Sequence, residues 1–342
     1  MELIPKVISL TDYVRLPTRL EAGAEQHKEW HHFCIVDPAV QVIVNLSLMR
    51  PPGSAPAAGD WAARLALLVR DTGWDGDLDT IPNREVRARR GSLDLQFGHN
   101  SLAFRDGCYH LSLSLENRPI TLQLVLRPLT YPLIRRNTQI AEGKINWVVV
   151  PRLAASGTVI VDRRVYRLDE TPAYHDHNWG QWRWGDDFAW QWGFALPAEA
   201  ENPWCVVFDR MTDRRRSTAL ELKLSLWKGD RLQRLFFQDE IRLEQSGFVV
   251  QPRLDKFPRP MSLLAPERTT DVPRRFTVRA ARGDDWLDCC FTAEDIAQIV
   301  VPNETNLGVT IINEVGGVLR LTGRIKGEDA AMEGRGFFEF LT

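Results

Sequence analysis

Apolar and polar residues alternate in short runs along most of the chain, and turn-forming residues separate the runs. The alternation is cleanest at residues 108–115 and 120–127, and similar runs recur at 157–168, 220–227 and 318–324. A period of two predicts strands with one buried face, and regular short strands are typical of antiparallel barrels and sandwiches. No repeat with the ~20–50-residue period of a solenoid is visible. We therefore predict an all-β fold.

Turn signals between the runs support this prediction. Asp106-Gly107 is typical of a tight hairpin. Residues 50–56, rich in proline and glycine, predict a loop, whereas residues 61–69 fit a helix by composition but indicate a strand beside their neighbours. Further turns are predicted at Asp162-Arg163, Gly229-Asp230, Ser246-Gly247 and Arg282-Gly283-Asp284.

One short segment near the C-terminus predicts a helix instead. Thr292 is a suitable N-cap, and Glu294 and Asp295 place acidic groups in the first turn, where the helix dipole favours them. The helix should end before Pro302. Residues 1–28 show no clear period, so no element is predicted there. The length of 342 residues suits two barrel-like halves joined near residues 185–200.

Composition and charge exclude several classes of protein. Hydrophobic residues make up 44% of the chain and charged residues 26%, with a formal net charge of −2. This balance gives no electrostatic reason to expect nucleic acid as a partner, and the short arginine groups fit solvated loops. Five cysteines without paired spacing favour a reducing, cytoplasmic location. Neither a signal peptide nor a transmembrane segment is predicted.

The candidate chemistry gathers in residues 174–193. Five of the chain's 12 tryptophans lie between positions 179 and 192, and Asp176 stands between His175 and His177 just upstream. Titratable groups beside large aromatic faces suit a site that holds an apolar molecule next to an acid or a base. The same residues also suit an aromatic core with a few hydrogen-bonded polar groups, and the sequence leaves both interpretations open.

The pair of histidines raises the question of a metal. His175 and His177 are two residues apart, so on a strand they share one face, while Asp176 points to the other. A third ligand is not visible in the sequence, although His31-His32 could supply one. We therefore expect no metal and no cofactor. Asp176 itself could hold a proton near neutral pH if it is buried against aromatic rings, and otherwise would cap a surface turn.

The strand predicted at residues 188–196 has two unlike faces. Its bulky face carries Phe188, Trp190, Trp192, Phe194 and Leu196, and its small face carries Ala189, Gln191, Gly193 and Ala195. Either face could line a ligand cavity. We favour the small face, since small residues leave room for a ligand while the bulky face packs elsewhere.

Two runs of residues resemble a known family. The segment Pro151-Arg152-Leu153-Ala154-Ala155-Ser156-Gly157-Thr158 and the motif Asp176-His177-Asn178-Trp179-Gly180 are similar to those of carotenoid 1,2-hydratases and AttH-like proteins. Glu29-Trp30 with Phe33 resembles a further aromatic motif of that family, with His31-His32 in place of two aromatic residues. Asn178 stands where the family usually has Glu, so the sequence departs from the pattern at a position that could relay a proton. The family also resembles, more distantly, fungal decalin-forming pericyclases.

This resemblance implies two lipocalin-like β domains, here 1–187 and 188–342, with the motif in the first. It also implies an enzyme that hydrates or cyclises a C=C bond of an apolar isoprenoid or polyene without a cofactor. Asp176 would be the acid, and His177, or else His175, would hydrogen-bond the carboxylate that forms. The residues expected to bind substrate are Trp30, His32, Tyr174, Trp179, Trp182, Trp184, Trp190, Gln191 and Trp192.

Two other functions stay open. A pericyclase would fold a polyene and lower the barrier mainly by orientation, and a carrier would only bind a hydrophobic ligand. Peripheral contact with a membrane for substrate uptake is compatible with each of these functions. The sequence does not specify the substrate or the oligomeric state.

Overall fold

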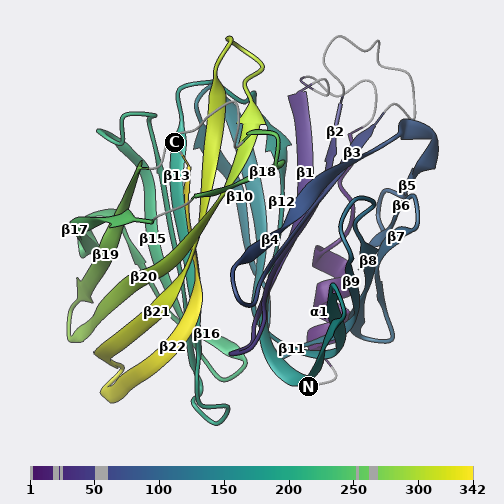
Figure 1. Cartoon of the computed structure of the whole chain (residues 1–342). Coiled ribbons are helices and arrows are strands. Elements are labelled where there is room, and N and C mark those ends of the chain that lie inside the picture. Colours follow the sequence, from purple (N-terminus) through teal and green to yellow (C-terminus); the bar gives the residue numbers. More distant parts are fainter. Residues whose placement is uncertain are drawn as a thin grey trace. The chain divides into compact units, whose positions relative to one another are not determined.

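The protein folds almost entirely into antiparallel strands, as predicted. The computed structural model describes residues 3–17, 23, 26–50, 61–251, 254–261 and 269–341. The chain divides into two compact units, Met1–Arg183 and Trp184–Thr342, each built around one large sheet. Figure 1 shows these sheets and the strands that form them. Apart from Arg50, the loop predicted at residues 50–56 lies outside the described residues.

The first unit contains a 12-stranded, nearly closed sheet. Its strand order is β4-β3-β2-β1-β12-β11-β9-β8-β7-β6-β5, and β10 pairs with β11. This order places β12 beside β1, although more than a hundred residues separate them in the chain. The strands are β1 His27–Val36, β2 Gln41–Met49, β3 Ala62–Arg70, β4 Trp74–Ile81, β5 Val86–Ala88, β6 Asp94–Phe97, β7 Asn100–Arg105, β8 Cys108–Ser114, β9 Ile120–Pro128, β10 Leu133–Ile140, β11 Gly143–Val161 and β12 Arg164–Gln181.

A short helix, α1 (Leu3–Thr11), lies inside the curve of this sheet (Figure 1). Its buried side chains are Ile4 and Ile8, four residues apart and therefore on one helix face. Both belong to the same apolar cluster as inward-facing strand residues such as Val44 and Leu65. The helix falls in the segment for which no element was predicted. It ends one residue before Asp12, which becomes important below.

The second unit contains a 10-stranded sheet. Its strand order is β16-β15-β14-β13-β22-β21-β20-β19-β17, and the short β18 pairs with β20 in parallel. The strands are β13 Ala189–Pro197, β14 Trp204–Thr212, β15 Ala219–Lys228, β16 Arg231–Phe237, β17 Ile241–Val250, β18 Asp255–Phe257, β19 Thr269–Arg282, β20 Asp285–Pro302, β21 Val309–Ile325 and β22 Glu328–Leu341. The described residues also contain the 3-10 turns η2 Asn83–Glu85 and η3 Gln238–Glu240.

The helix predicted from Thr292 to Pro302 is wrong, because these residues form the second half of β20. Residues 296–301 are buried on both faces of the strand, and Ile296, Ile299, Val300 and Val301 are β-branched. Such residues lose rotamer freedom in a helix and pack well in a sheet. Pairing with β21 along the full length of β20 therefore outweighs the local capping signal at Thr292.

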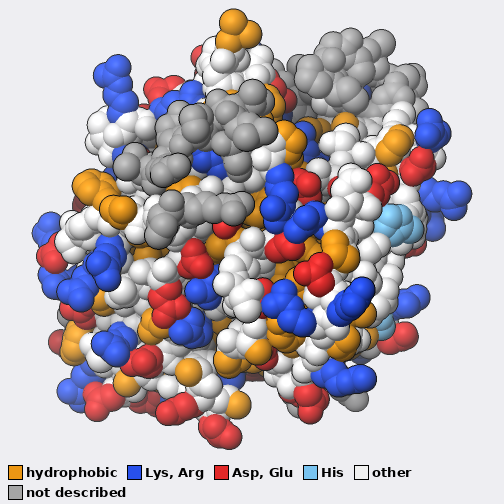
Figure 2. Space-filling view, viewed as in Figure 1, with side chains coloured by type: hydrophobic (Ala, Val, Ile, Leu, Met, Phe, Trp, Pro, Cys, Tyr) orange, Lys and Arg blue, Asp and Glu red, His pale blue; other side chains and the backbone are white. Residues whose placement is uncertain are grey.

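Most of the predicted turns are confirmed. Asp106 and Gly107 have φ values of 53° and 78°, as a type I′ hairpin between β7 and β8 requires. Residues 61–69 correspond to strand β3, as their neighbours indicated. Gly247 does not separate two strands, because β17 runs through it. On the face shown in Figure 2, basic and acidic side chains are interspersed over the surface. Among the described residues, none of the helices is long and apolar enough to cross a membrane.

Candidate functional site

Each face of strand β12 carries its own set of polar residues. Its pairing with β1 sets His32 opposite Asp176 and His31 opposite His177. Residues directly opposite in an antiparallel pair point to the same side of the sheet. Tyr174, Asp176 and Asn178 therefore share a face with His32, as the strand period predicted. His175 and His177 share the other face of the sheet with His31. We call it the inner face, because Phe33, opposite His175, belongs to the apolar core cluster of this unit.

Asp176 lies between two hydrogen-bond donors on its own strand. The hydroxyl of Tyr174 donates to Oδ2 at 2.9 Å, and the amide of Asn178 donates to Oδ1 at 2.7 Å. The three side chains are buried, and Asp176 is 3% exposed. Their i±2 spacing on a strand makes this contact local. Each carboxyl oxygen is therefore held in a fixed direction.

The neighbouring strand adds aromatic and imidazole groups to this face. His32 is buried, and its Nε2 lies 3.0 Å from Sγ of Cys34. Burial, together with the charge of His175, lowers the pKa of His32 to about 3, so this imidazole is neutral at physiological pH. Trp30, opposite Asn178, meets Trp182 edge to face with ring centroids 5.2 Å apart.

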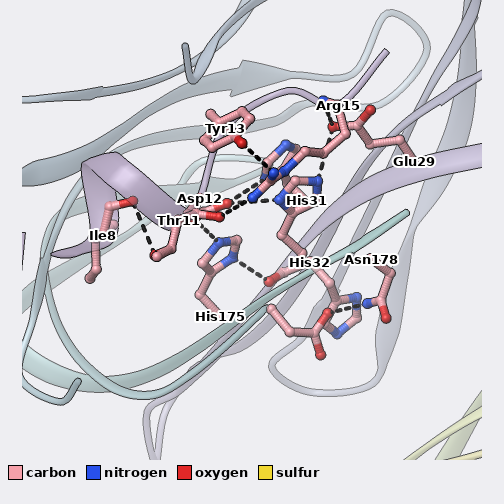
Figure 3. Close-up of polar contacts among 12 residues, drawn as sticks. Ile8, Thr11, Asp12, Tyr13, Arg15, Glu29, His31, His32, His175 and Asn178 are labelled. Carbon is pink, nitrogen blue, oxygen red and sulfur yellow. Dashed lines mark hydrogen bonds and ion pairs between the residues drawn. The ribbon is translucent and has the colours of Figure 1, made fainter. Parts of the chain in front are cut away.

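On the inner face, Asp12 is the centre of a buried network that the sequence did not reveal (Figure 3). Oδ2 of Asp12 accepts a hydrogen bond from the hydroxyl of Tyr109 at 2.7 Å and lies 2.8 Å from Nε2 of His175. Oδ1 lies 2.9 Å from Nδ1 of His177. Burial alone would raise the pKa of Asp12, but the charges and hydrogen bonds of His175 and His177 hold it well below its usual range.

Glu29 continues this network on the far side of His177. Its Oε1 lies 2.9 Å from Nε2 of His177 and accepts the backbone N–H of Arg15 at 2.7 Å, while Oε2 lies 3.2 Å from His27. Burial alone would raise the pKa of Glu29, but the bonds from His177 and His27 lower it to about 2. Burial alone would lower the pKa of His177, but the bonds to Asp12 and Glu29 raise it to about 9.

This network changes the roles expected for the histidines. Both ring nitrogens of His177 contact carboxylates on the inner face, so His177 is turned away from Asp176. His175 likewise contacts Asp12 and the backbone carbonyl of His32. Trp179 also lies on the inner face, 4.9 Å from the ring of His177 and under the guanidinium of Arg15. Tyr174 and Asn178 occupy the positions beside Asp176 that were assigned to histidine.

The remaining predicted residues belong to the second unit. The ring centroids of Trp184 and Trp190 lie 5.8 Å apart, and the indole N–H of Trp190 donates to the carboxyl of Glu339. Trp192, on the same face of β13, lies 5.6 Å from Phe194. Gln191 points to the other face and accepts a hydrogen bond from Arg210 at 3.0 Å. The bulky face of β13 therefore combines aromatic rings with a partly buried carboxyl group, which the sequence did not predict.

Solved structures of similar fold agree with the family resemblance. No family model and no curated protein sequence matches the chain. A candidate AttH from Nitrosomonas europaea superposes with a TM-score of 0.66 at 14% identity, covering 96% of this chain and 97% of that one. Kievitone hydratase from Nectria haematococca superposes with a TM-score of 0.58 at 13% identity, covering 96% of this chain and 93% of that one. CghA in complex with Sch210972 superposes with a TM-score of 0.57 at 13% identity, covering 93% of this chain and 88% of that one. The chain thus has the fold of AttH-like proteins.

Proposed function

We propose that the protein is an enzyme that hydrates or cyclises a C=C bond of an apolar isoprenoid or polyene, with Asp176 as the acid. The observation that supports this most is the pair of hydrogen bonds that Tyr174 and Asn178 make to Asp176. In the acid form, one oxygen of Asp176 carries the proton toward Tyr174, whose oxygen can accept it. The other oxygen accepts from Asn178.

The reaction begins when Asp176 delivers its proton to one alkene carbon, leaving a cation on the other. Water, or a second double bond of the same molecule, then captures the cation. The proton released in the final step returns to the Asp176 carboxylate, so the acid is regenerated and no redox cofactor is required. A dry site slows the first step because it disfavours the carboxylate. Tyr174 and Asn178 offset this by donating hydrogen bonds to the carboxylate as it forms.

The surrounding residues suit an apolar substrate and a cationic intermediate. Trp30 and the neutral His32 lie on the Asp176 face of the sheet, beside it in register. Aromatic faces attract a cation, and an uncharged imidazole does not repel it. The fold shared with kievitone hydratase agrees with a hydratase, and the fold shared with CghA keeps a pericyclase as the alternative.

Solvent isotopes distinguish the mechanisms. The purified protein would be incubated with a panel of isoprenoids and polyenes in D2O, and separately in H2-18O, and the products analysed by mass spectrometry. Acid-initiated chemistry should place one solvent deuterium on carbon, and hydration should also add one 18O. A pericyclic product without deuterium would contradict the acid mechanism, and binding without any product would indicate a carrier.

A further inference from the structure

We infer that Asp12, His31 and His175 form a binding site for one divalent cation, with Zn²⁺ as the ion that suits these donors. One ligand atom from each residue lies within 4.8 Å of the others, and all three side chains are buried. The inference is independent of the proposed function, because the cluster lies on the opposite face of β12 from Asp176. The sequence argued against a metal since it offered no third ligand, and the fold supplies that ligand.

The spacing of the donors suits a small tetrahedral ion. Nε2 of His175 lies 2.8 Å from Oδ2 of Asp12, and Nδ1 of His31 lies 3.8 Å from Oδ1 of the same carboxyl. Zinc bonds to nitrogen and oxygen are ~2.0–2.2 Å long, so neighbouring donors of a tetrahedral site lie roughly 3.3 Å apart. The two observed distances, one to each oxygen of Asp12, lie on either side of that value. Small side-chain adjustments would bring the three donors to bonding distance.

His31 is the residue that points most directly to a missing ligand. It is 1% exposed, and among the described residues neither of its ring nitrogens has a hydrogen-bond partner. Its ring stacks on that of His177, with centroids 4.0 Å apart. Buried polar atoms in folded proteins normally have partners, and a cation would provide one here.

Hydrogen bonds from the surrounding residues fix the orientation of the proposed ligands. Nδ1 of His175 lies 2.9 Å from the backbone carbonyl of His32, so Nδ1 must donate and Nε2 faces Asp12. Tyr109 donates to the Asp12 carboxyl from the other side. Metal-binding histidines typically donate their second nitrogen to a carbonyl or carboxylate in this way. Glu29 and His177 form a second such group of three with His31.

The ion would have a structural role. Asp12 follows α1, His31 lies on β1 and His175 lies on β12, so one ion would join the N-terminal helix to two adjacent strands. Phe33 stacks on His175 at 4.0 Å, and Tyr109 packs against the same ring at 4.7 Å. These rings enclose the ligands, as expected for a closed structural site rather than a catalytic one.

The test uses the full-length protein, stripped with a chelator under denaturing conditions and refolded with or without ZnCl2. Elemental analysis after dialysis should find one equivalent of zinc in the wild-type protein. His31→Phe keeps the stacked ring but removes both donors. It should weaken zinc binding by at least ~100-fold, because mutating even a residue that only orients a ligand typically costs ~10–100-fold. His99→Phe, at an exposed histidine outside the cluster, should bind as the wild type does.

Calorimetry provides a second readout that needs no variant. Titration of ZnCl2 into the stripped wild-type protein should saturate at one ion per chain. The inference is overturned if the wild-type protein binds or retains no stoichiometric zinc. Equal binding by His31→Phe would indicate an adventitious ion only. If His31→Phe fails to refold, the stoichiometry of the wild-type protein decides.

Discussion

The ring of Phe338 fills the space beside Gly193. The two residues are partners across β13 and β22, and a Cβ added at Gly193 would lie 2.4 Å from the ring carbons. Phe338 also stacks on Phe291 at 4.2 Å within the core of the second unit. The small face of β13, which we favoured as room for a ligand, thus accommodates the protein's own core at Gly193.

Gly193→Ala should therefore destabilise the protein by overpacking. Inserting one methyl group into a filled core costs about 1–3 kcal/mol of unfolding free energy. In the double variant Gly193→Ala/Phe338→Leu, the smaller side chain should remove part of that penalty, giving a favourable coupling energy in a urea double-mutant cycle. Additive effects, or a Gly193→Ala variant as stable as wild type, would show that the ring of Phe338 does not occupy this space.

Asp12→Asn should destabilise the first unit strongly. Asn keeps the shape of the side chain but removes the carboxylate charge that faces Nδ1 of the buried His177, whose pKa is raised to about 9. Breaking a buried ion pair in this way typically costs ~3–5 kcal/mol. Asp94→Asn, at an exposed position on β6, is the matched control and should change stability by less than about 0.5 kcal/mol. Equal denaturation midpoints for the two variants would argue against the network.

Glu339 should make the stability of the second unit depend on pH. Burial raises the pKa of Glu339 to about 7, despite the hydrogen bonds from Trp190 and Glu314. The folded state therefore binds this proton more tightly than the unfolded chain, whose Glu has a pKa of about 4.3. The resulting stabilisation is present below about pH 4.3 and is lost as the pH rises toward 7, by an amount on the order of 3 kcal/mol.

Denaturation of wild type and Glu339→Gln across this pH range measures the effect. The amide stays neutral, so the variant should lack the loss of stability between about pH 4.3 and 7. Parallel stability profiles for the two proteins would mean that Glu339 titrates normally.

A polyene that binds beside Asp176 should quench tryptophan emission saturably. Trp30 lies on that face of the sheet, so Trp30→Phe should reduce the amplitude of quenching. The control is Trp286→Phe, which alters a side chain that is 46% exposed on β20 in the second unit. If Trp286→Phe lowered the amplitude of quenching and Trp30→Phe did not, the polyene would bind away from Asp176.

The sequence predicts those features that depend on neighbours in the chain. Asp176 and its partners Tyr174 and Asn178 are two residues apart, so the strand period alone places them on one face. Hairpins such as Asp106-Gly107 are equally local. The helix predicted at Thr292 failed because pairing with a strand that follows in the chain outweighs the capping signal.

The inner network could not be predicted because its residues lie far apart in sequence. Asp12 meets His175 across 163 positions, and it follows a helix of nine residues that has too few turns to show a period. Glu29 and His31 were visible within the aromatic motif of the resemblance. Only the pairing of β1 with β12 shows that His31 faces His177, and that His177 faces away from Asp176.

Tyr174→Phe tests the immediate surroundings of Asp176. Removing the hydroxyl deletes one of the two donors to the carboxylate and leaves the ring in place. Losing one such donor should slow turnover, by up to the ~10²–10³-fold seen for oxyanion donors, with little change in substrate affinity. Unchanged kcat in steady-state kinetics would show that the developing carboxylate does not depend on Tyr174.

The most direct test of the proposed function is the ratio of kcat for Asp176→Asn to that of wild type. Asn can keep the packing and the hydrogen bonds of this face but cannot deliver a proton to carbon. With equal melting temperatures for both proteins, kcat should fall by about 10²–10⁴-fold, as for loss of a general acid, while Asp94→Asn turns over normally. Near-wild-type turnover by a folded Asp176→Asn would contradict the assignment of Asp176 as the acid.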